Sequence, residues 1–141
     1  MNDVLINKIQ SIQRCVARAK EEYKEAGKGF AQNYSRQDAA ILNITRGCEQ
    51  AIDLANHLIK IKKLGIPTSS AESFALLARQ AIISTELAEK LRRMVGFRNI
   101  AVHQYQTLQI VIVEAVITLG LDDLIEFTLK IAQFSQSAID R

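Results

Sequence analysis

The sequence predicts an all-α fold, an antiparallel bundle of about five to six helices in a single domain over residues 1–141. Apolar residues recur at spacings of three and four along most of the chain, which is the pattern of amphipathic helices. Leu, Ile and Ala dominate the composition, and the chain contains one proline. The only strand-like stretch is QIVIVEAVITL, and its length favours a helix.

The first helix is expected over residues 3–26. Its apolar residues follow one another in alternating steps of four and three: Leu5, Ile9, Ile12, Val16, Ala19, Tyr23 and Ala26. Such a narrow apolar seam packs against another helix. Gly27 and Gly29 should end the helix, because glycine is common just beyond a helix C-terminus.

The second helix is expected to begin at Ser35, because Asp38 three residues later makes a pattern close to a capping box. Its apolar residues continue to Ile59. It should stop at residues 62–65, where basic residues precede a glycine and Pro67 follows.

Two further helices begin at serine caps. Ser69 with Glu72 is a second capping box, and it opens a short helix that reaches about Arg79. Ser84 is the next N-cap, with Glu86 in the first helical turn.

The helix that Ser84 opens should reach residues 102–103. Within it, Glu86 with Lys90 and Glu89 with Arg93 are favourable pairs four residues apart. These pairs indicate the face of the helix that lies in solvent.

A fifth helix is expected over residues 108–119, with Gly120 breaking it. Asp122 and Asp123 then open the last helix, which should run to about Ser137.

The composition restricts the class of protein. The net charge of +3 and the pI of about 9.0 favour anionic partners mildly, without amounting to a nucleic-acid signature. The N-terminus has no signal-peptide pattern, and no apolar run is long enough to span a bilayer. We therefore expect a cytoplasmic protein with no membrane partner.

The residues that bind metals or form disulfides are sparse. Cys15 and Cys48 lie on apolar helix faces, far apart in sequence, so both are expected to be reduced and to pack as small hydrophobic side chains. His57 has no second histidine nearby, which favours a partly exposed surface residue over a metal ligand. Neither a metal nor a cofactor is predicted.

The stretch FRNIAVHQY, at the end of the fourth expected helix, does not fit a simple amphipathic pattern. On a helical wheel Arg98 falls at the centre of the apolar stripe formed by Leu87, Leu91, Met94, Val95, Ala101 and Val102. An arginine in that position is unfavourable unless it is paired or binds an anion. Arg98 is therefore a candidate functional residue.

Three other residues accompany Arg98. Asn99 and His103 are four residues apart at the side of the stripe, near Gly96, which would let a backbone or a phosphate approach closely. His103 lies about 140° from Arg98 around a straight helix. Either the chain turns near His103, or a second copy of the helix supplies the missing half of the site. A two-fold pairing would gather two Arg, two His and two Tyr105 side chains in one cleft.

The chemistry of these residues suits RNA cleavage. Arginine offers a planar cation to a phosphate, and histidine can transfer a proton near neutral pH. Structural roles stay open beside this interpretation. Arg98 could extend from the core edge to solvent or pair with a carboxylate, His103 could cap a helix C-terminus, and Tyr105 could pack in the core.

The motif RNIAVHQY resembles the R-x4-H-x-Y form of the HEPN superfamily. The stretches SRQDAAILNITRGCEQAIDLANHLIKIKKLGIPTSSAESFALLARQAIIST and LDDLIEF resemble the corresponding parts of the HepT-like toxins of HEPN/MNT modules. The resemblance covers nearly the whole chain and implies a HEPN-like helical bundle.

The resemblance implies a metal-independent endoribonuclease toxin that acts as a homodimer, with a composite site in the dimer cleft. By the same resemblance, Arg98 would hold the phosphate, Asn99 would assist it, and His103 would transfer the proton as the RNA 2′-hydroxyl attacks. A nucleotidyltransferase antitoxin would neutralise the toxin by adenylylating Tyr105. Added charge and bulk there would exclude RNA from an anion-binding cleft.

Two alternatives belong to other functional classes. The chain could be a non-catalytic HEPN adaptor that binds a nucleotidyltransferase and its substrate, or a structural dimer without a nucleic-acid partner. The intact pair of Arg98 and His103 argues against the adaptor. The acidic residues Asp122, Asp123 and Glu126 are interpreted as favourable first-turn residues rather than a catalytic pair. The basic residues of the first helix form either a solvated face or a non-specific phosphate track: Arg14, Arg18, Lys20, Lys24 and Lys28.

Overall fold

The structure is a computed structural model that describes residues 2–140, with side chains for residues 2–136. The described part of the chain forms six α-helices and no strand, which confirms the predicted all-α fold. The helices are α1 (Asp3–Ala26), α2 (Tyr34–Lys62), α3 (Ser70–Arg79), α4 (Thr85–His103), α5 (Ile110–Ala115) and α6 (Leu121–Asp140). Two 3-10 segments (Gly27–Gln32 and Tyr105–Thr107) and a π-helical segment (Val116–Gly120) connect them.

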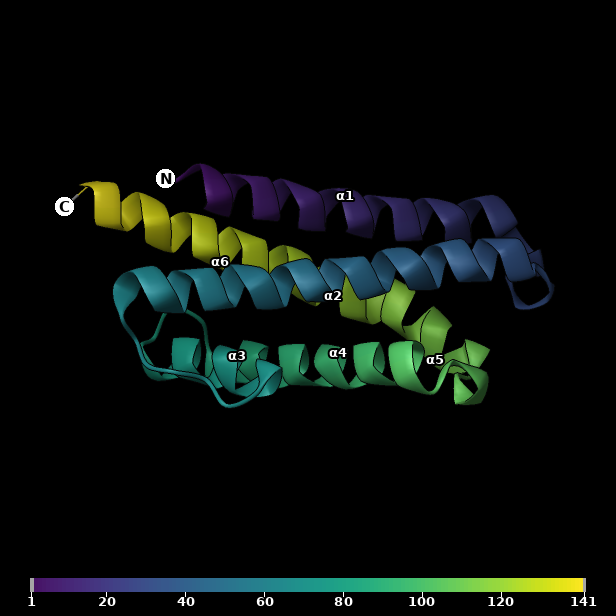
Figure 1. Ribbon diagram of the computed structural model, residues 1–141. Helices are drawn as coiled ribbons and strands as arrows, with labels where there is room; N and C mark the ends of the chain where they lie inside the picture. The colour runs from purple at the N-terminus through teal and green to yellow at the C-terminus, as the bar shows by residue number, and fades with distance from the viewer. Residues whose placement is uncertain (1, 141) are drawn as a thin grey trace.

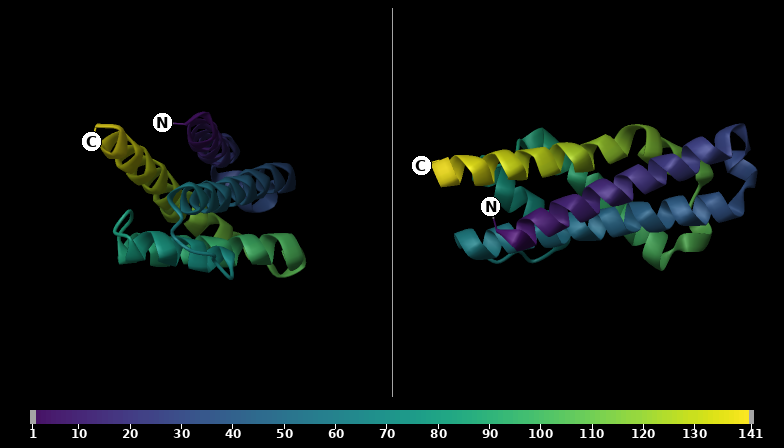
Figure 2. Two further views of the ribbon diagram at one scale, coloured as in Figure 1. Left: turned by 60° about the vertical axis from the view of Figure 1, so that its left-hand side comes forward. Right: turned by 90° about the horizontal axis from the view of Figure 1, so that it is seen from above.

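The helix α2 is the central element of the bundle. It runs antiparallel to α1 along nearly its whole length, and α3 and α4 lie along its other side (Figure 1). The helix α6 returns beside α1 and also contacts α2 and α4, so that both chain ends lie at the same end of the bundle (Figure 2). The helix α4 is thereby in contact with both α2 and α6.

Side-chain caps start four of the helices. Ser69 and Ser84 accept hydrogen bonds from first-turn N–H groups, as predicted. The predicted cap at Ser35 is wrong, because Asn33 begins α2 instead. Its Oδ1 accepts a hydrogen bond from the Arg36 N–H at 3.1 Å, and asparagine is as good an N-cap as serine.

The C-terminal ends of α1 and α2 agree with the predicted stops. Gly27 follows α1 with φ 55°, a backbone angle that glycine adopts without steric strain. After α2 the left-handed residue is Lys63, with φ 52°, and its N–H returns to the carbonyl of Ile59.

Gly120 does not end the helical stretch, contrary to the prediction. The predicted helix over residues 108–119 is an α-helix only over Ile110–Ala115, and it passes through the π-helical segment directly into α6. A methyl group at Gly120 would lie 3.0 Å from the Sδ atom of Met94. At this position the small glycine allows close packing against Met94 of α4, and no turn is formed. The helix α6 continues past the predicted end at Ser137 to Asp140.

The core is built from the predicted apolar seams. Phe74 and Phe127 are fully buried and meet edge to face, with ring centroids 5.4 Å apart. Cys15 and Cys48 are both free and buried, which confirms their predicted role as small core side chains.

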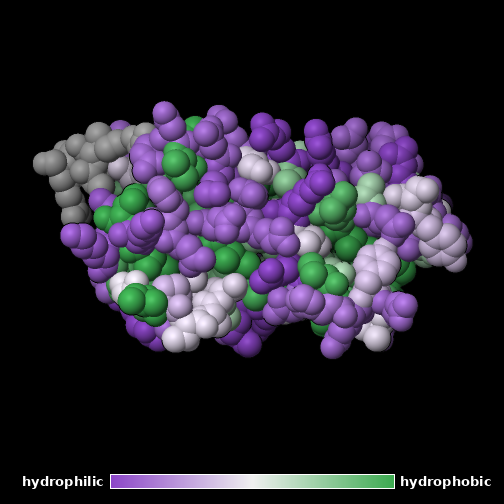
Figure 3. Space-filling view, viewed as in Figure 1, coloured by the Kyte–Doolittle hydropathy of each residue, from purple (hydrophilic) through white to green (hydrophobic). Residues whose placement is uncertain are grey.

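The surface is largely polar, with separate apolar patches (Figure 3). Glu86 pairs with Lys90 at 3.4 Å, as predicted. Glu89 pairs with Arg92 instead of the predicted Arg93, through two contacts of 2.5 and 3.0 Å, because a residue three positions away also lies beside it on a helix. Within the described residues, no helix combines the length and the hydropathy needed to cross a bilayer.

Candidate active site

Arg98 lies on the buried face of α4, as the sequence predicts. Leu91, Met94, Val95 and Ala101 around it are buried, and Arg98 itself is half-buried. The prediction for Val102 is wrong, because this side chain is 48 % exposed beside an open pocket.

Among the described residues, the guanidinium of Arg98 has no hydrogen-bond or ion-pair partner. Its Nε atom is buried and has no hydrogen-bond acceptor among the described residues. No carboxylate of the described chain forms an ion pair with Arg98, so the structure does not support the interpretation that it pairs within the chain. A buried donor without an acceptor destabilises the fold by about 1–3 kcal/mol, so an acceptor from outside the chain is expected.

The buried thiol of Cys48 interacts electrostatically with Arg98. The Cys48 thiol donates to the carbonyl of Met94 at 3.7 Å. Burial raises the pKa of Cys48 to about 12, while the positive charge of Arg98 acts in the opposite direction. Cys48 therefore stays protonated near neutral pH and is a packing residue rather than a nucleophile.

Asn99 and His103 are exposed on the last turns of α4. The helix ends at His103, and the chain turns at Gln104, whose N–H donates to the carbonyl of Ile100 at 2.8 Å. Arg98 and His103 both lie within α4, so the turn comes after the histidine and does not by itself bring the two side chains together. His103 also lies in the last turn of α4, where a cation interacts favourably with the helix dipole, which is the position that the helix-capping interpretation requires.

Tyr105 is not a core residue. It begins the 3-10 segment after α4 and is 46 % exposed. Its hydroxyl donates a hydrogen bond to the Asp38 carboxylate on α2. This hydrogen bond, with smaller contributions from burial and the negative charge of Asp38, raises the pKa of Tyr105 to about 12.

Asp38 is the residue of this site that sequence reasoning missed. It was interpreted as part of a capping box, and a separation of 67 residues from Tyr105 leaves no local pattern that would connect the two. Only the antiparallel packing of α2 beside the end of α4 brings them together.

A pocket of about 470 Å³ lies beside this pair, between α2 and the end of α4. Its walls are mostly apolar: Asp38, Ile41, Leu42, Thr45, Ala101, Val102 and Tyr105. The tyrosine hydroxyl therefore stands at the edge of a hollow rather than on a flat surface.

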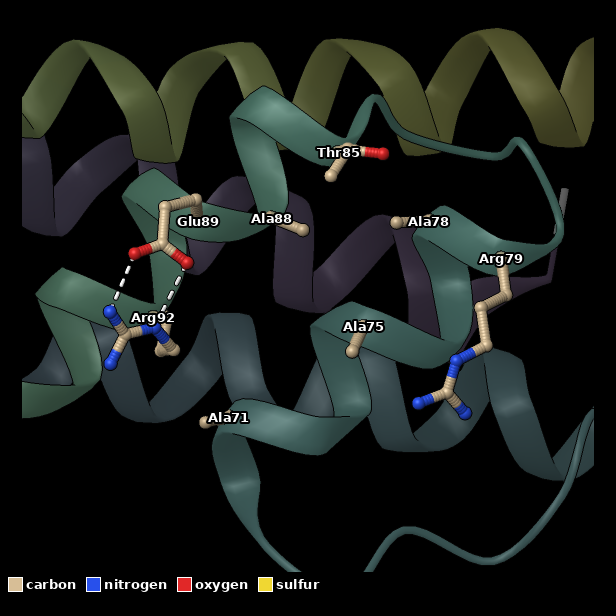
Figure 4. A pocket seen from close by; sticks show the side chains of 8 residues that line it. All are labelled: Ala71, Ala75, Ala78, Arg79, Thr85, Ala88, Glu89 and Arg92. Carbon is tan, nitrogen blue, oxygen red and sulfur yellow. Dashed lines mark hydrogen bonds and ion pairs between the residues drawn. The ribbon is translucent and has the colours of Figure 1, made fainter.

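A second hollow of about 280 Å³ lies between α3 and the first half of α4 (Figure 4). Half of its lining residues are alanines, and the Glu89–Arg92 pair closes one side, while Arg79 stands apart from that pair. None of the motif residues lines this hollow, so it is separate from the candidate site.

The remaining candidates have structural roles. The His57 Nε2 atom lies 3.3 Å from the amide of Asn2, which caps α1. Asp122 forms an ion pair with Lys20 at 2.7 Å. Asp123 is half-buried in the first turn of α6, and burial raises its pKa. Within residues 2–136, no cluster of three His, Cys, Asp or Glu side chains is placed to hold a metal ion.

The fold and the site together define a class of protein, a helical bundle that carries an arginine without an internal partner, an exposed histidine and an exposed tyrosine around the end of one helix. The model of the family "Ribonuclease HepT-like" matches residues 12–131. The chain belongs to this HepT-like family of ribonucleases.

Individual relatives agree with this assignment. The chain is 47 % identical over 127 residues to the mRNA nuclease HepT of Shewanella oneidensis, covering 90 % of this chain and 95 % of that protein. It is similar to the solved structure of the tri-AMPylated Shewanella oneidensis HEPN toxin in complex with MNT antitoxin, with a TM-score of 0.89 and 45 % identity over 94 % of this chain and 99 % of the toxin. YutE of Bacillus subtilis has the same fold, with a TM-score of 0.82 at 14 % identity over 97 % of this chain and 92 % of YutE.

Proposed function

We propose that this protein is a metal-independent endoribonuclease toxin of a toxin–antitoxin pair. The observation that carries the proposal is the buried Nε of Arg98, which lacks an acceptor among the described residues, close to the exposed His103 at the end of the same helix. A cation held without a partner at the surface of α4 is suited to bind an anion, and phosphate is the anion of an RNA backbone.

The two residues have complementary roles in cleavage. His103 accepts the proton of the RNA 2′-hydroxyl as its oxygen bonds to the adjacent phosphorus. Arg98 stabilises the negative charge that develops on the phosphate oxygens, and Asn99 assists with its amide. The bond from phosphorus to the 5′-oxygen breaks and that oxygen takes up a proton, which leaves a 2′,3′-cyclic phosphate and a 5′-hydroxyl end.

A second copy of the chain completes the site in this proposal. An apolar groove of about 600 Å³ runs between α4 and the α5–α6 junction, and Gly96, Phe97 and Ile100 are among the residues that line it. Ile112 and Leu119 in the same groove are 48 % and 74 % exposed. Pairing of two copies across this groove buries these side chains and brings the two motif helices together.

A nucleotidyltransferase antitoxin neutralises the toxin by transferring AMP to Tyr105. The modified relative named above, solved with its MNT antitoxin, supports this part of the proposal by analogy. The exposed hydroxyl of Tyr105 is accessible to a partner. A phosphate attached there carries negative charge toward the anion-binding end of α4 and competes with RNA.

The proposal is tested by incubating labelled single-stranded RNA with purified protein in excess EDTA, beside His103→Ala. We expect the unsubstituted protein to leave 2′,3′-cyclic phosphate ends and the variant to be slower by about 100-fold or more. Circular dichroism of both proteins controls for folding. Equal cleavage by both removes His103 from the mechanism. No cleavage by protein whose mass shows no attached AMP favours the non-catalytic adaptor instead.

A further inference from the structure

We infer that Asp38 is the general base that accepts the phenol proton of Tyr105 when AMP is transferred to that tyrosine. The inference rests on the proposed function, because it assigns a residue to the modification of the proposed acceptor. It places part of the chemistry of neutralisation in the toxin chain itself, on a helix that does not carry the R-x4-H-x-Y motif.

The hydrogen bond between the two residues has the direction that a base requires. The Tyr105 hydroxyl donates to Oδ1 of Asp38, so its proton already lies between the two oxygens. The lone pairs of the phenol oxygen are not used by this bond and are available to a phosphorus atom. Both residues are exposed, so an outside active site can reach the oxygen without unfolding the chain.

In the part of the chain that the structure describes, the carboxylate of Asp38 has no partner that competes with Tyr105. Within the described residues, no lysine or arginine forms an ion pair with it. The other walls of the adjacent pocket are aliphatic, apart from the hydroxyl of Thr45. The phenol proton therefore has one carboxylate of its own chain placed to receive it.

The other two tyrosines of the chain do not combine solvent exposure with a described hydrogen bond to a carboxylate. Tyr23 also donates to a carboxylate, Glu114 at 2.9 Å, but it is half-buried and packs edge to face on Phe30. Tyr34 is 75 % exposed, and none of the described hydrogen bonds joins its hydroxyl to a carboxylate. Among the described residues, only Tyr105 is both exposed and hydrogen-bonded to a carboxylate, so its hydroxyl is accessible as an acceptor whereas that of Tyr23 serves packing.

The transfer step needs such a base. The hydrogen bond to Asp38 raises the pKa of Tyr105 to about 12, so the phenol is protonated near neutral pH and must lose its proton as it reacts. With ATP as the donor, the phenol oxygen bonds to the α-phosphorus while the bond from that phosphorus to pyrophosphate breaks. The proton passes to the Asp38 carboxylate and then to solvent, which leaves Tyr105-AMP and free pyrophosphate.

The test measures AMP transfer to purified, AMP-free protein by its nucleotidyltransferase antitoxin with ATP and Mg²⁺, followed by intact mass. We expect Asp38→Asn to lower the kcat of transfer by about 100-fold without changing the KM for ATP, because the antitoxin holds the nucleotide. Asp38→Glu should restore part of the rate. Glu114→Gln, the matched change beside Tyr23, should transfer at the original rate.

Several results would overturn the inference. Transfer to Asp38→Asn at the original kcat means that the antitoxin supplies the base. A loss confined to antitoxin affinity, with full transfer at saturation, means that Asp38 only helps docking. If peptide mapping finds AMP on a residue other than Tyr105 in the unsubstituted protein, the proposed modification site itself fails. The peptide-mapping result uses only the unsubstituted protein, so failure of the proposed modification site is distinguished from failure of Asp38 as the base.

Discussion

At the scale of single residues, Arg98 connects the sequence with the proposed activity. Its place in the middle of an apolar stripe was visible in the sequence, and its missing acceptor is visible only in the structure. A side chain whose polar atoms lack a partner in the free protein is typical of a ligand-binding residue. Proteins keep such an unfavourable side chain where function requires it.

Replacing Arg98 should therefore separate activity from stability. We expect Arg98→Ala to lower the rate of RNA cleavage by about 100-fold or more, since it removes the charge that stabilises the reacting phosphate. The free energy of unfolding in urea should change by about 1 kcal/mol or less, because the lost packing of the side-chain stem is offset by removal of an unsatisfied donor. Arg98→Met, which keeps an unbranched stem, is the matched control. An unfolded Arg98→Ala variant would support a purely structural role.

Tyr105 allows the toxin activity and its neutralisation to be separated. Tyr105→Phe should cleave RNA at the original rate, because the phenol oxygen has no part in cleavage in our proposal. The same variant should escape the antitoxin, since it lacks the accepting oxygen. Intact mass after incubation with the antitoxin and ATP is the measurement. One AMP still attached to this variant would exclude Tyr105 as the only acceptor.

At the scale of the helical elements, two glycines that the sequence does not distinguish have different environments. A methyl group at Gly96 meets nothing within 4 Å, whereas one at Gly120 lies 3.0 Å from Met94 Sδ. Packing within the chain therefore explains Gly120 but not Gly96. An open glycine on α4, in the lining of the proposed dimer groove, indicates close approach by a second chain or by RNA.

The two alanine substitutions form a matched pair. Gly96→Ala should raise the free energy of unfolding of the protein by about 0.5–1 kcal/mol. Alanine favours the helical conformation of α4, and its methyl group would meet no neighbouring atom. Gly120→Ala should lose that gain through crowding against Met94. We also expect Gly96→Ala to reduce RNA cleavage despite its stability, measured in the same EDTA assay. Undiminished cleavage by this variant would argue against close approach at Gly96.

At the scale of the whole molecule, the bundle presents the motif at one end of α4 beside an apolar groove. The groove contains exposed Ile100, Ile112 and Leu119, which a chain that acts alone has no evident reason to expose together. In our proposal, pairing of two copies through this surface would bury the exposed apolar groups and let the Arg98 of one copy face the His103 of the other.

A charged residue in the groove should test this pairing. We expect Leu119→Asp to give a monomer in size-exclusion chromatography with light scattering and to lose RNA cleavage, because it places a carboxylate in the apolar contact. Val111→Asp is the control, since Val111 is as exposed as Leu119, at 74 %, but does not line the groove. A Leu119→Asp variant that remains dimeric and active would exclude this groove as the interface.

The sequence predicted most of the elements because their signals are local. The caps at Ser69 and Ser84 and the seam of α1 depend on residues within one or two helical turns, where backbone hydrogen bonding decides the outcome. The predictions at Ser35 and Gly120 failed for different reasons. Asn33 competes locally for the same cap, whereas Gly120 continues a helical stretch and packs beside Met94 of another helix, a contact that the neighbouring sequence does not reveal.

The sequence by itself determined the helical class of the fold, the position of Arg98 on the apolar face of its helix and the resemblance to a ribonuclease family. Both signals are local in sequence, because they consist of the spacing of apolar residues and of one short motif. Only the tertiary structure decided that Arg98 Nε lacks an acceptor among the described residues and that Tyr105 reaches Asp38. Both facts depend on which residues the folded helices bring together. Tyr105 and Asp38 are 67 residues apart in sequence, and no short-range pattern predicts such a contact.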